Sequence, residues 1–409
     1  MESARPTSTT PAQSSSAPTA STRSRARSWG PSRTSCSTSP SAPCSWFQRP
    51  NSLGPVSDFE KLRDLPIEVE GYELEPNDHE YSPEFTRGST IVHLRGRGEE
   101  GLGEDVVYEV LDHIANRDLG PRFDLTGPKT LGEMCALLGE LDLFEGSPPE
   151  RDPSRQYRRW AFESAALDLA LRQSGVSLLE AVGRDPTPLR FVCSTRLTTF
   201  GDETASSTVA ITNRLARYPG LEFKLDPEND WTPELISEIA EVATVQTMDL
   251  KGYYKGTVVE VETDPELYRA VAENFPEAWL EDPDLTDETR EVLEPHWERL
   301  TYDAPLHSLA DVKELAPARA INSKPSRFGS LEELMDIYAY CEEQGLQIYG
   351  GGQGEVGLGR GQIQYLASLY HPGTPNDVAP AGYNDPSVPQ GLPTSPMDPV
   401  PSETGFRWG

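Results

Sequence analysis

The sequence has little lysine and little cysteine, and it contains no long apolar run. A helix needs roughly 20 consecutive apolar residues to cross a bilayer. No apolar run in the 409 residues approaches that length, so no membrane-spanning helix is expected. The five cysteines form no CxxC pair, which argues against zinc-ribbon and thioredoxin-type sites and favours a reduced, cytoplasmic protein. The 36 basic residues face 66 acidic ones, and this net charge of −30 argues against nucleic acid as a main partner.

Lysine is the rarer of the two basic residues, with seven lysines in the chain against 29 arginines. Genomic composition bias accounts for most of this imbalance. Where arginine is the default cation, a retained lysine is still informative, because its ammonium group can shift its pKa and lose a proton. Lys224, Lys251 and Lys324 are therefore candidate site residues.

The two ends of the chain differ from its middle. In residues 1–56, Ser, Thr and Pro occupy 30 positions, and six Arg accompany one Glu. This segment has no apolar periodicity, and three interpretations stay open: a disordered tail, a transit-like peptide, or an artefact of the assigned start site. Residues 374–409 contain eight prolines, which predict an extended Pro-rich strap and argue against a helix.

Short apolar runs alternate with amphipathic helical patterns over residues 186–373. The expected strands are 189–195, 221–226, 245–251, 278–282, 300–304, 319–324 and 346–351, with a possible eighth at 376–380. Such alternation predicts a parallel sheet and an α/β fold. We expect a TIM-like (β/α)7β barrel, with an open doubly wound sheet as the alternative. Residues 57–185 predict a preceding α+β domain.

Three successive expected strands end in a carboxylate: Asp249, Glu281 and Asp303. In a parallel barrel the functional residues lie at the carboxyl ends of the strands. Three negative charges so close together require a cation, and hard divalent ions such as Mg²⁺ prefer oxygen ligands. A single acid at such a position is more simply a solvated surface residue, so the hypothesis depends on all three.

Three of the seven lysines also end expected strands. Lys224 and Asp226 are two residues apart on a strand and therefore face the same side. Lys324 approaches the barrel mouth from the opposite side. A lysine beside a divalent cation and another lysine has a lowered pKa and can act as a general base. Lys251 is equally compatible with a surface loop, and Lys255 is expected on the surface.

Four segments carry a resemblance to a known family. They are "AALDLALRQSGVSLLEAVG" (165–183), "AWLEDPD" (278–284), "INSKPSRFGSLEELMDI" (321–337) and "GGGQGEVGLGRGQIQYLASLYHP" (350–372). In this order they resemble the last helix of the capping domain, the strand-four metal motif, the strand-six lysine motif and the strand-seven turn of the enolase superfamily. Within it, they are most similar to the muconate-lactonising, muconate cycloisomerase-like subgroup.

The resemblance implies roles for individual residues. It implies Asp249, Glu281 and Asp303 as Mg²⁺ ligands and Lys324 as an acid/base group. It also implies that residues 57–185 form a capping domain, whose loops near 72–90 and 118–130 would set specificity. The implied reaction is abstraction of a proton α to a carboxylate, with the enediolate held by the metal.

Two positions depart from the subgroup. The subgroup has Lys-x-Lys at the end of strand two, whereas this chain has Lys224-Leu225-Asp226, with aspartate in place of the transferring lysine. The family often has Asn two residues after the strand-three aspartate, and here that residue is Lys251. Epimerisation needs bases on both faces and is therefore disfavoured. Syn elimination or cycloisomerisation requires only Lys324, with Lys224 steadying negative charge. No histidine ends strand seven, which disfavours the mandelate-racemase type.

We therefore expect a Mg²⁺-dependent lyase or isomerase that acts on a small carboxylate. One alternative is a dipeptide epimerase-like isomerase in which Asp226 replaces a base. Another is a diverged, non-catalytic barrel that keeps the metal site. The family is usually oligomeric, so the resemblance also implies a homo-oligomer.

Overall fold

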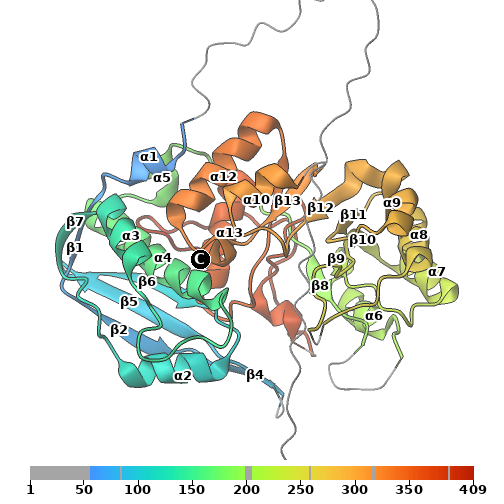
Figure 1. The fold of residues 1–409 in the computed structure, drawn as a ribbon, viewed down its shortest axis with the longest axis horizontal. Coiled ribbons are helices and arrows are strands. Elements are labelled where there is room, and N and C mark those ends of the chain that lie inside the picture. The colour runs from blue at the N-terminus through green and yellow to red at the C-terminus, as the bar shows by residue number, and fades with distance from the viewer. Residues whose placement is uncertain (1–55, 83–84, 199–204, 258, 316–317, 386) are drawn as a thin grey trace, which may run out of the picture. The chain divides into compact units, whose positions relative to one another are not determined.

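The computed structural model describes residues 56–409 except for 83–84, 199–204, 258, 316–317 and 386 (Figure 1). The interpretations of the N-terminal tail therefore concern residues almost entirely outside the described part. Within the described part, no helix combines the length and apolar character needed to cross a bilayer.

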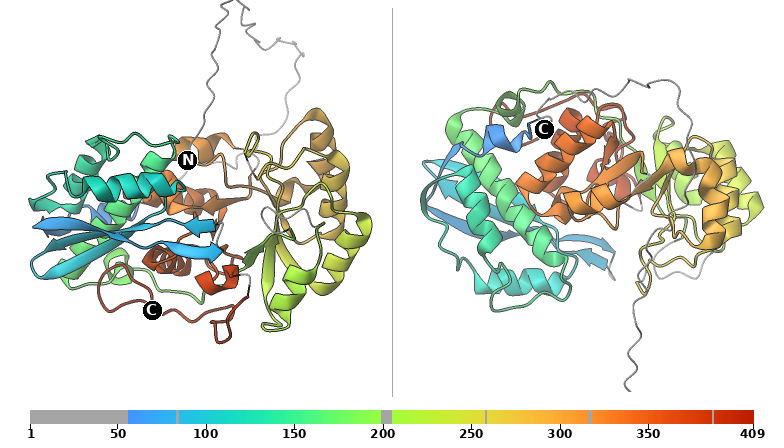
Figure 2. Two further views of the ribbon diagram at one scale, coloured as in Figure 1. Left: turned by 90° about the horizontal axis from the view of Figure 1, so that it is seen from below. Right: turned by 45° about the horizontal axis from the view of Figure 1, so that its top comes forward.

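A three-stranded antiparallel sheet forms the core of the N-terminal region, in the order β2-β5-β6. Its strands are β2 (Gly71–Pro76), β5 (Thr90–Gly96) and β6 (Glu99–Asp105). Helix α4 (Ser154–Ser174), drawn in green, lies across one face of this sheet, drawn in blue (Figures 1 and 2). The close contact depends on a glycine, because a Cβ on Gly103 would lie 1.9 Å from the Ala161 carbonyl oxygen.

Smaller elements complete this region. They are α1 (Phe59–Leu62), β1 (Pro66–Val69), β3 (His79–Ser82), β4 (Phe85–Arg87), α2 (Val110–Leu119), β7 (Gly127–Thr130), α3 (Leu131–Glu140) and α5 (Leu178–Val182). Strand β1 pairs antiparallel with β7, and β3 pairs with β4 as a hairpin. The region is thus an α+β arrangement of the kind expected.

Seven parallel strands follow in the order β14-β13-β12-β11-β10-β9-β8. They are β8 (Cys193–Thr195), β9 (Glu222–Leu225), β10 (Thr244–Asp249), β11 (Trp279–Glu281), β12 (Leu300–Tyr302), β13 (Ala320–Ser323) and β14 (Gln347–Gly350). Each of the seven expected strand segments overlaps one of them, and six contain the observed strand completely, since β10 begins one residue before the expected 245–251. The sequence prediction of a seven-stranded parallel α/β sheet is therefore confirmed.

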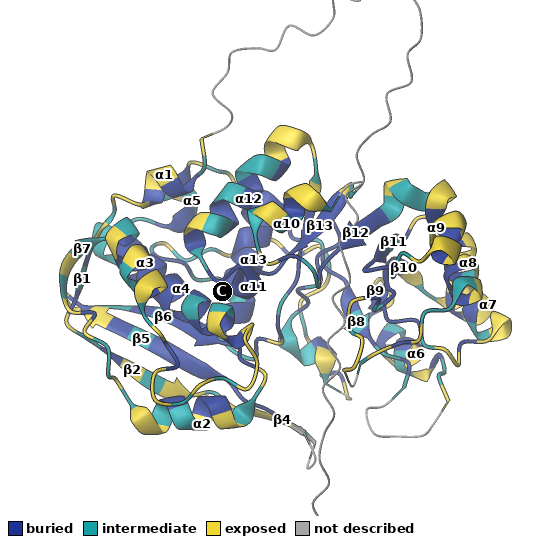
Figure 3. Cartoon of the chain, viewed as in Figure 1, coloured by how far each residue is buried: buried dark blue, intermediate teal, exposed yellow. Residues whose placement is uncertain are grey.

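Helices connect the successive strands, and α13 follows the last of them. They are α6 (Val209–Leu215), α7 (Pro233–Val242), α8 (Pro265–Asn274), α9 (Asp287–Leu293), η1 (Glu294–Arg299), α10 (Leu309–Glu314), α11 (Pro325–Phe328), α12 (Leu331–Gln344) and α13 (Leu358–Tyr370). Helices α7, α8 and α9 have exposed outer faces, while the strands beside them are buried (Figure 3). Their starts follow the sequence signals: the Thr232 hydroxyl accepts from Leu235 N, and the Ser330 hydroxyl accepts from Glu333 N.

The two edge strands of the parallel sheet are not paired with each other. They are joined instead through two isolated bridges, Phe191 to Asn376 and Gly351 to Asp377. The expected eighth strand at 376–380 is reduced to these bridges, and the structure shows a curled seven-stranded sheet. A fully closed (β/α)7β barrel therefore stays a prediction.

The C-terminal residues contain one short 3-10 helix, η2 (Ala381–Asn384), and otherwise run as extended chain. Met397 forms an antiparallel bridge with Leu189, next to β8. Phe406 is fully buried, and its backbone N–H donates to Asp168 on α4 at 2.7 Å. The last part of the chain thus contacts both the parallel sheet and the N-terminal region.

Candidate active site

The three carboxylates predicted from strand ends come from adjacent strands. Asp249 and Glu281 are register partners at the ends of β10 and β11. Glu281 pairs with Thr301 on β12, and Asp303 lies two residues beyond Thr301. Side chains two apart on a strand share a face, so Asp303 shares the face of Glu281. All three residues are buried.

The Lys224 ammonium group contacts this carboxylate set from the end of β9. Its Nζ donates to Glu281 Oε1 and lies 3.2 Å from Asp249 Oδ2 and 3.7 Å from Asp377 Oδ2. Burial alone would lower the pKa of Lys224, but the neighbouring carboxylates, first Glu281 and then Asp249, outweigh it and raise this pKa well above its usual value. The expected lowering assumed a divalent cation beside the lysine, and carboxylates act in the opposite direction.

Lys251 lies in the site rather than on a surface loop. Its Nζ is 2.6 Å from Asp249 Oδ2 and 3.3 Å from Asp226 Oδ2, and its backbone N–H donates to Asp249 Oδ1 at 3.2 Å. A left-handed backbone, with φ of 55°, turns the side chain back onto the strand that precedes it. Burial raises the pKa of the Asp226 carboxyl above its ordinary value, although the charge of Lys251 opposes this. At 3.3 Å, and with both side chains 12% exposed, Asp226 and Lys251 form an ion pair that is largely shielded from solvent.

On the other side of the set, Asp303 is held by two cations. Lys324 Nζ lies 2.6 Å from Asp303 Oδ2, and Arg327 Nη1 lies 2.6 Å from Oδ1. Although burial raises the pKa of Asp303, Arg327 and Lys324 lower it to about 2. The sequence predicted Lys324 as a site residue; Arg327, one turn further on, was not singled out.

Asp282 belongs to the same acidic group. Oxygen atoms of Asp249, Glu281 and Asp282 all lie within 4.8 Å of one another. Both Asp282 oxygens accept backbone hydrogen bonds, from Asp303 N at 2.8 Å and Ala304 N at 2.9 Å. Burial and the charge of Asp303 raise the pKa of Asp282 to about 7. Because both of its oxygens accept from backbone N–H groups of residues 303 and 304, Asp282 helps to fix the turn after β12.

Two tyrosines complete the site and were not singled out from the sequence. The Tyr349 hydroxyl donates to Glu281 Oε2 and accepts from Thr301 Oγ1 at 3.1 Å. The ring centroid of Tyr254 lies 5.0 Å from Lys251 Nζ, a cation–π contact. The available signal was modest, because Tyr349 lies inside the expected strand 346–351 and Tyr254 lies three residues after Lys251.

The N-terminal region reaches the turn between β14 and α13. Arg87 Nη2 donates to the Gln353 carbonyl oxygen at 2.9 Å, and Arg87 Nε donates to that of Gly354 at 3.2 Å. The Tyr108 hydroxyl also contacts the Gln353 side chain. The expected specificity segment at 72–90 therefore touches the parallel-sheet region through Arg87.

The donor set fits a hard divalent cation. Asp249 and Glu281 supply carboxylate oxygens from register-paired positions, and both already face ammonium groups. Hard oxygen ligands are what Mg²⁺ prefers, whereas nitrogen or sulfur donors would favour zinc.

Comparison with known proteins agrees with this architecture. A crystal structure described as an unknown member of the enolase superfamily from Enterococcus faecalis V583 has a TM-score of 0.53, at 20% identity over 80% of this chain and 94% of that chain. A dipeptide epimerase from Methylococcus capsulatus, complexed with Mg ion, has a TM-score of 0.55, at 19% identity over 76% of this chain and 89% of its own.

Curated relatives are more similar in sequence. An o-succinylbenzoate synthase from Bacillus subtilis is 29% identical over 225 residues, 53% of this chain and 57% of that protein. An N-succinylamino acid racemase from Thermus thermophilus is 25% identical over 307 residues, 71% of this chain and 78% of that protein. The chain thus spans little more than half the length of the first of these relatives and about three quarters of the second.

Fold and relatives together show that the chain resembles the enolase superfamily, and within it the muconate-lactonising subgroup. The resemblance seen in the sequence is confirmed at this level. The chain belongs to the family DUF8230, described as a domain of unknown function, because it matches both domain models of that family. The N-terminal domain model matches residues 60–181, and the C-terminal domain model matches residues 185–385.

Proposed function

We propose that the protein is a lyase or isomerase that removes a proton α to the carboxylate of a small substrate. The observation that carries the proposal is the buried strand-end cluster, in which carboxylates of neighbouring strands are in register and lysines flank them on both sides. The relatives named as o-succinylbenzoate synthase and N-succinylamino acid racemase support the same class of activity.

In this proposal Asp249, Glu281 and Asp303 hold Mg²⁺. When bound there, the ion would neutralise the negative charge that the reaction creates next to the substrate carboxylate. The alternation of side chains along β12 supports Asp303 as the third ligand, because it faces the same side as Glu281. Asp282 holds the backbone of Asp303 in place, because its Oδ1 accepts from the Asp303 N–H.

Lys324 is proposed as the acid/base group. It lies at the end of β13 and is 8% exposed, so it is shielded from bulk water yet within reach of a bound molecule. Its contact with Asp303 fixes the ammonium group beside the proposed ligands. Lys224, on the β9 side, would hold negative charge rather than transfer a proton, because the carboxylates around it favour its protonated form.

A single competent lysine suits a cycloisomerase or a syn dehydratase. One observation favours a second candidate, an epimerase or racemase. The Lys251 ammonium group lies beside Asp226, so a lysine is present at the β9 end despite the aspartate there. A dipeptide epimerase-like activity therefore stays a candidate, and so does a non-catalytic metal-binding protein.

The decisive experiment measures exchange of the α-proton in deuterated water. N-succinylamino acids and dipeptides of both configurations serve as probes, in the presence of Mg²⁺. We expect Lys324→Ala to abolish exchange and Lys255→Ala, at a 62% exposed side chain, to leave it unchanged. Exchange at the wild-type rate in Lys324→Ala would refute the assignment of the base.

The same assay separates the candidates. Exchange from one configuration only supports a lyase or cycloisomerase, whereas exchange from both supports an epimerase. If the wild-type protein exchanges no probe while calorimetry shows Mg²⁺ binding that Glu281→Gln weakens, the non-catalytic candidate is correct. Unchanged Mg²⁺ affinity in Glu281→Gln would show that the carboxylates are not a metal site. The homo-oligomeric state likewise stays a prediction, which light scattering tests.

A further inference from the structure

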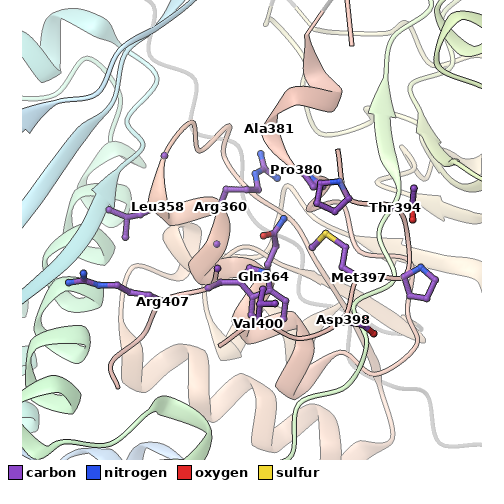
Figure 4. Close-up of a pocket in the computed structure, with 16 residues that line it drawn as sticks. Leu358, Arg360, Gln364, Pro380, Ala381, Thr394, Met397, Asp398, Val400 and Arg407 are labelled. Atoms are coloured by element: carbon purple, nitrogen blue, oxygen red, sulfur yellow. The ribbon is translucent and has the colours of Figure 1, made fainter. Parts of the chain in front are cut away.

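A cleft of about 780 Å³ lies between helix α13 and the C-terminal segment, outside the strand-end site (Figure 4). None of the proposed metal ligands or lysines lines it. Cavities of 300–1,000 Å³ are the usual size for small-molecule sites.

The walls of the cleft are mainly apolar. Leu358 from α13 lines one side, Pro380 another, and Met397 and Val400 from the C-terminal segment a third. Met397 is 8% exposed, whereas Val400 is 48% exposed and stands at the rim. This lining suits an apolar molecular body.

One buried cation interrupts the apolar lining. Arg360 extends from α13 toward Pro380 and Ala381 (Figure 4), and the residue is 9% exposed. Among the described residues, its Nε has no hydrogen-bond partner. The nearest carboxylate is that of Glu355, at 3.7 Å from Arg360 Nη2, which is longer than a hydrogen bond. Arg360 is therefore a buried guanidinium with an unused donor.

The second arginine of the cleft differs. Arg407 lines it only with its stem, because its Nε donates to Asp168 at 2.8 Å and its Nη2 donates to the Glu100 carbonyl oxygen at 2.5 Å. In Figure 4 its side chain points away from Arg360. Arg360 is thus the cation that a ligand in this cleft would meet.

We propose that this cleft binds an amphipathic monocarboxylate, with its apolar body against Met397 and Leu358 and its carboxylate on Arg360. Arg360 lines the cleft, and a guanidinium–carboxylate pair is among the strongest charge-assisted hydrogen bonds. Asp398, exposed at the rim, disfavours a second negative charge. The ligand class is therefore an apolar molecule with a single anionic head.

The test titrates the full-length protein with decanoate, below the concentration at which decanoate aggregates, and follows binding by calorimetry. Decanol lacks the charge, acetate lacks the apolar body, and decanedioate adds a second charge. We expect saturable binding of decanoate, weaker binding of decanol and decanedioate, and no binding of acetate. Equal affinity for decanoate and decanol would overturn the role of Arg360.

Variants locate the binding. Arg360→Met should weaken decanoate binding at least tenfold and leave decanol unchanged, while Arg269→Met, on α8 with a 48% exposed side chain, is the matched control. Val400→Trp fills the rim and should abolish binding of both molecules. If Arg360→Met does not fold, Arg360→Lys, which keeps the charge but loses Nε, should show an intermediate affinity. Unchanged decanoate binding in Val400→Trp would show that the ligand binds elsewhere and would refute the proposal.

Discussion

Glu104 on β6 connects the N-terminal region to the turn that precedes α13, and its substitution is the sharpest test of that contact. Its carboxylate is 2% exposed and accepts from the backbone N–H groups of Val356 at 2.9 Å, Gly357 at 3.1 Å and Gly359 at 2.8 Å. The Ser89 hydroxyl donates to it at 2.8 Å. One side chain thus satisfies the amide groups at the start of a helix from another part of the chain.

Glu104→Gln keeps the shape but replaces one acceptor oxygen with an NH₂ donor. Oε1 accepts from Ser89, Val356 and Gly357, so the amide oxygen should take that position. The NH₂ group then faces Gly359 N, which is buried and loses its acceptor. An unsatisfied buried donor costs about 1–3 kcal/mol, so we expect the free energy of unfolding to fall by about 2 kcal/mol.

The pH dependence of this loss has a defined sign. Burial, and then the charge of Glu355, raise the pKa of Glu104 above its usual value. The folded state therefore binds this proton more tightly than the unfolded state, and the contribution of Glu104 to stability is full below pH 4.5 and is lost as the pH rises through its folded pKa. The difference in the free energy of unfolding between wild type and Glu104→Gln should consequently become smaller from pH 4.5 to pH 8.

Urea unfolding at several pH values measures both the loss of unfolding free energy in Glu104→Gln and its dependence on pH. Glu99→Gln on the same strand is the matched control, because Glu99 is 38% exposed and its one ion pair among the described residues is with Arg172 at 3.0 Å. It should change stability by less than about 0.5 kcal/mol. If the difference in the free energy of unfolding between wild type and Glu104→Gln grows with pH, the reasoning is refuted. The hydrogen bonds from the helix N–H groups would then lower the pKa of Glu104 more than burial raises it.

Three further predictions concern other buried charges and hydroxyls. Asp105→Asn breaks the buried pair with Arg158, whose Nε lies 2.8 Å from the carboxylate, and should cost about 3–5 kcal/mol in urea unfolding. That loss should shrink below pH 4, because the folded-state pKa of Asp105 is lowered and the pair loses its stabilising effect as the pH falls. Lys251→Met removes a cation 2.6 Å from Asp249, so calorimetry should show tighter Mg²⁺ binding, by about tenfold. Tyr349→Phe removes the hydroxyl that donates to the β11 glutamate and should lower the free energy of unfolding by about 1–3 kcal/mol.

Local signals in the sequence predicted the parallel sheet and its helices well. Ser330 and Gly345 mark the two ends of α12, because one supplies the N-terminal cap and the other adopts the left-handed conformation, with φ of 67°, at the C-terminus. Parallel strands also align their carboxyl ends, so Asp249 and Glu281 were expected to meet, and they are register partners. These predictions required only the chemistry of short segments.

Contacts between distant segments were not predictable in the same way. Nothing in the sequence around Arg87 indicates that its guanidinium binds carbonyl groups of Gln353 and Gly354. Closure of the sheet also depends on long-range pairing, and Asn376 and Asp377 form single bridges where a strand was considered possible. A side chain that binds backbone groups leaves no pattern of residue types from which its partner can be inferred.

Asp226 shows where a motif and a structure give different accounts of the same site. Along β9, the segment Lys224-Leu225-Asp226 lacks the second lysine that the resemblance implies. In the structure, Lys251 from the neighbouring strand end lies 3.3 Å from Asp226, because its left-handed backbone turns the side chain back toward β9 and β10. An ammonium group is thus present at the β9 end, but it comes from 25 residues later in the chain. The sequence of β9 alone shows only an aspartate in place of a lysine. The charge balance of the folded site depends on the ends of β9 and β10 together.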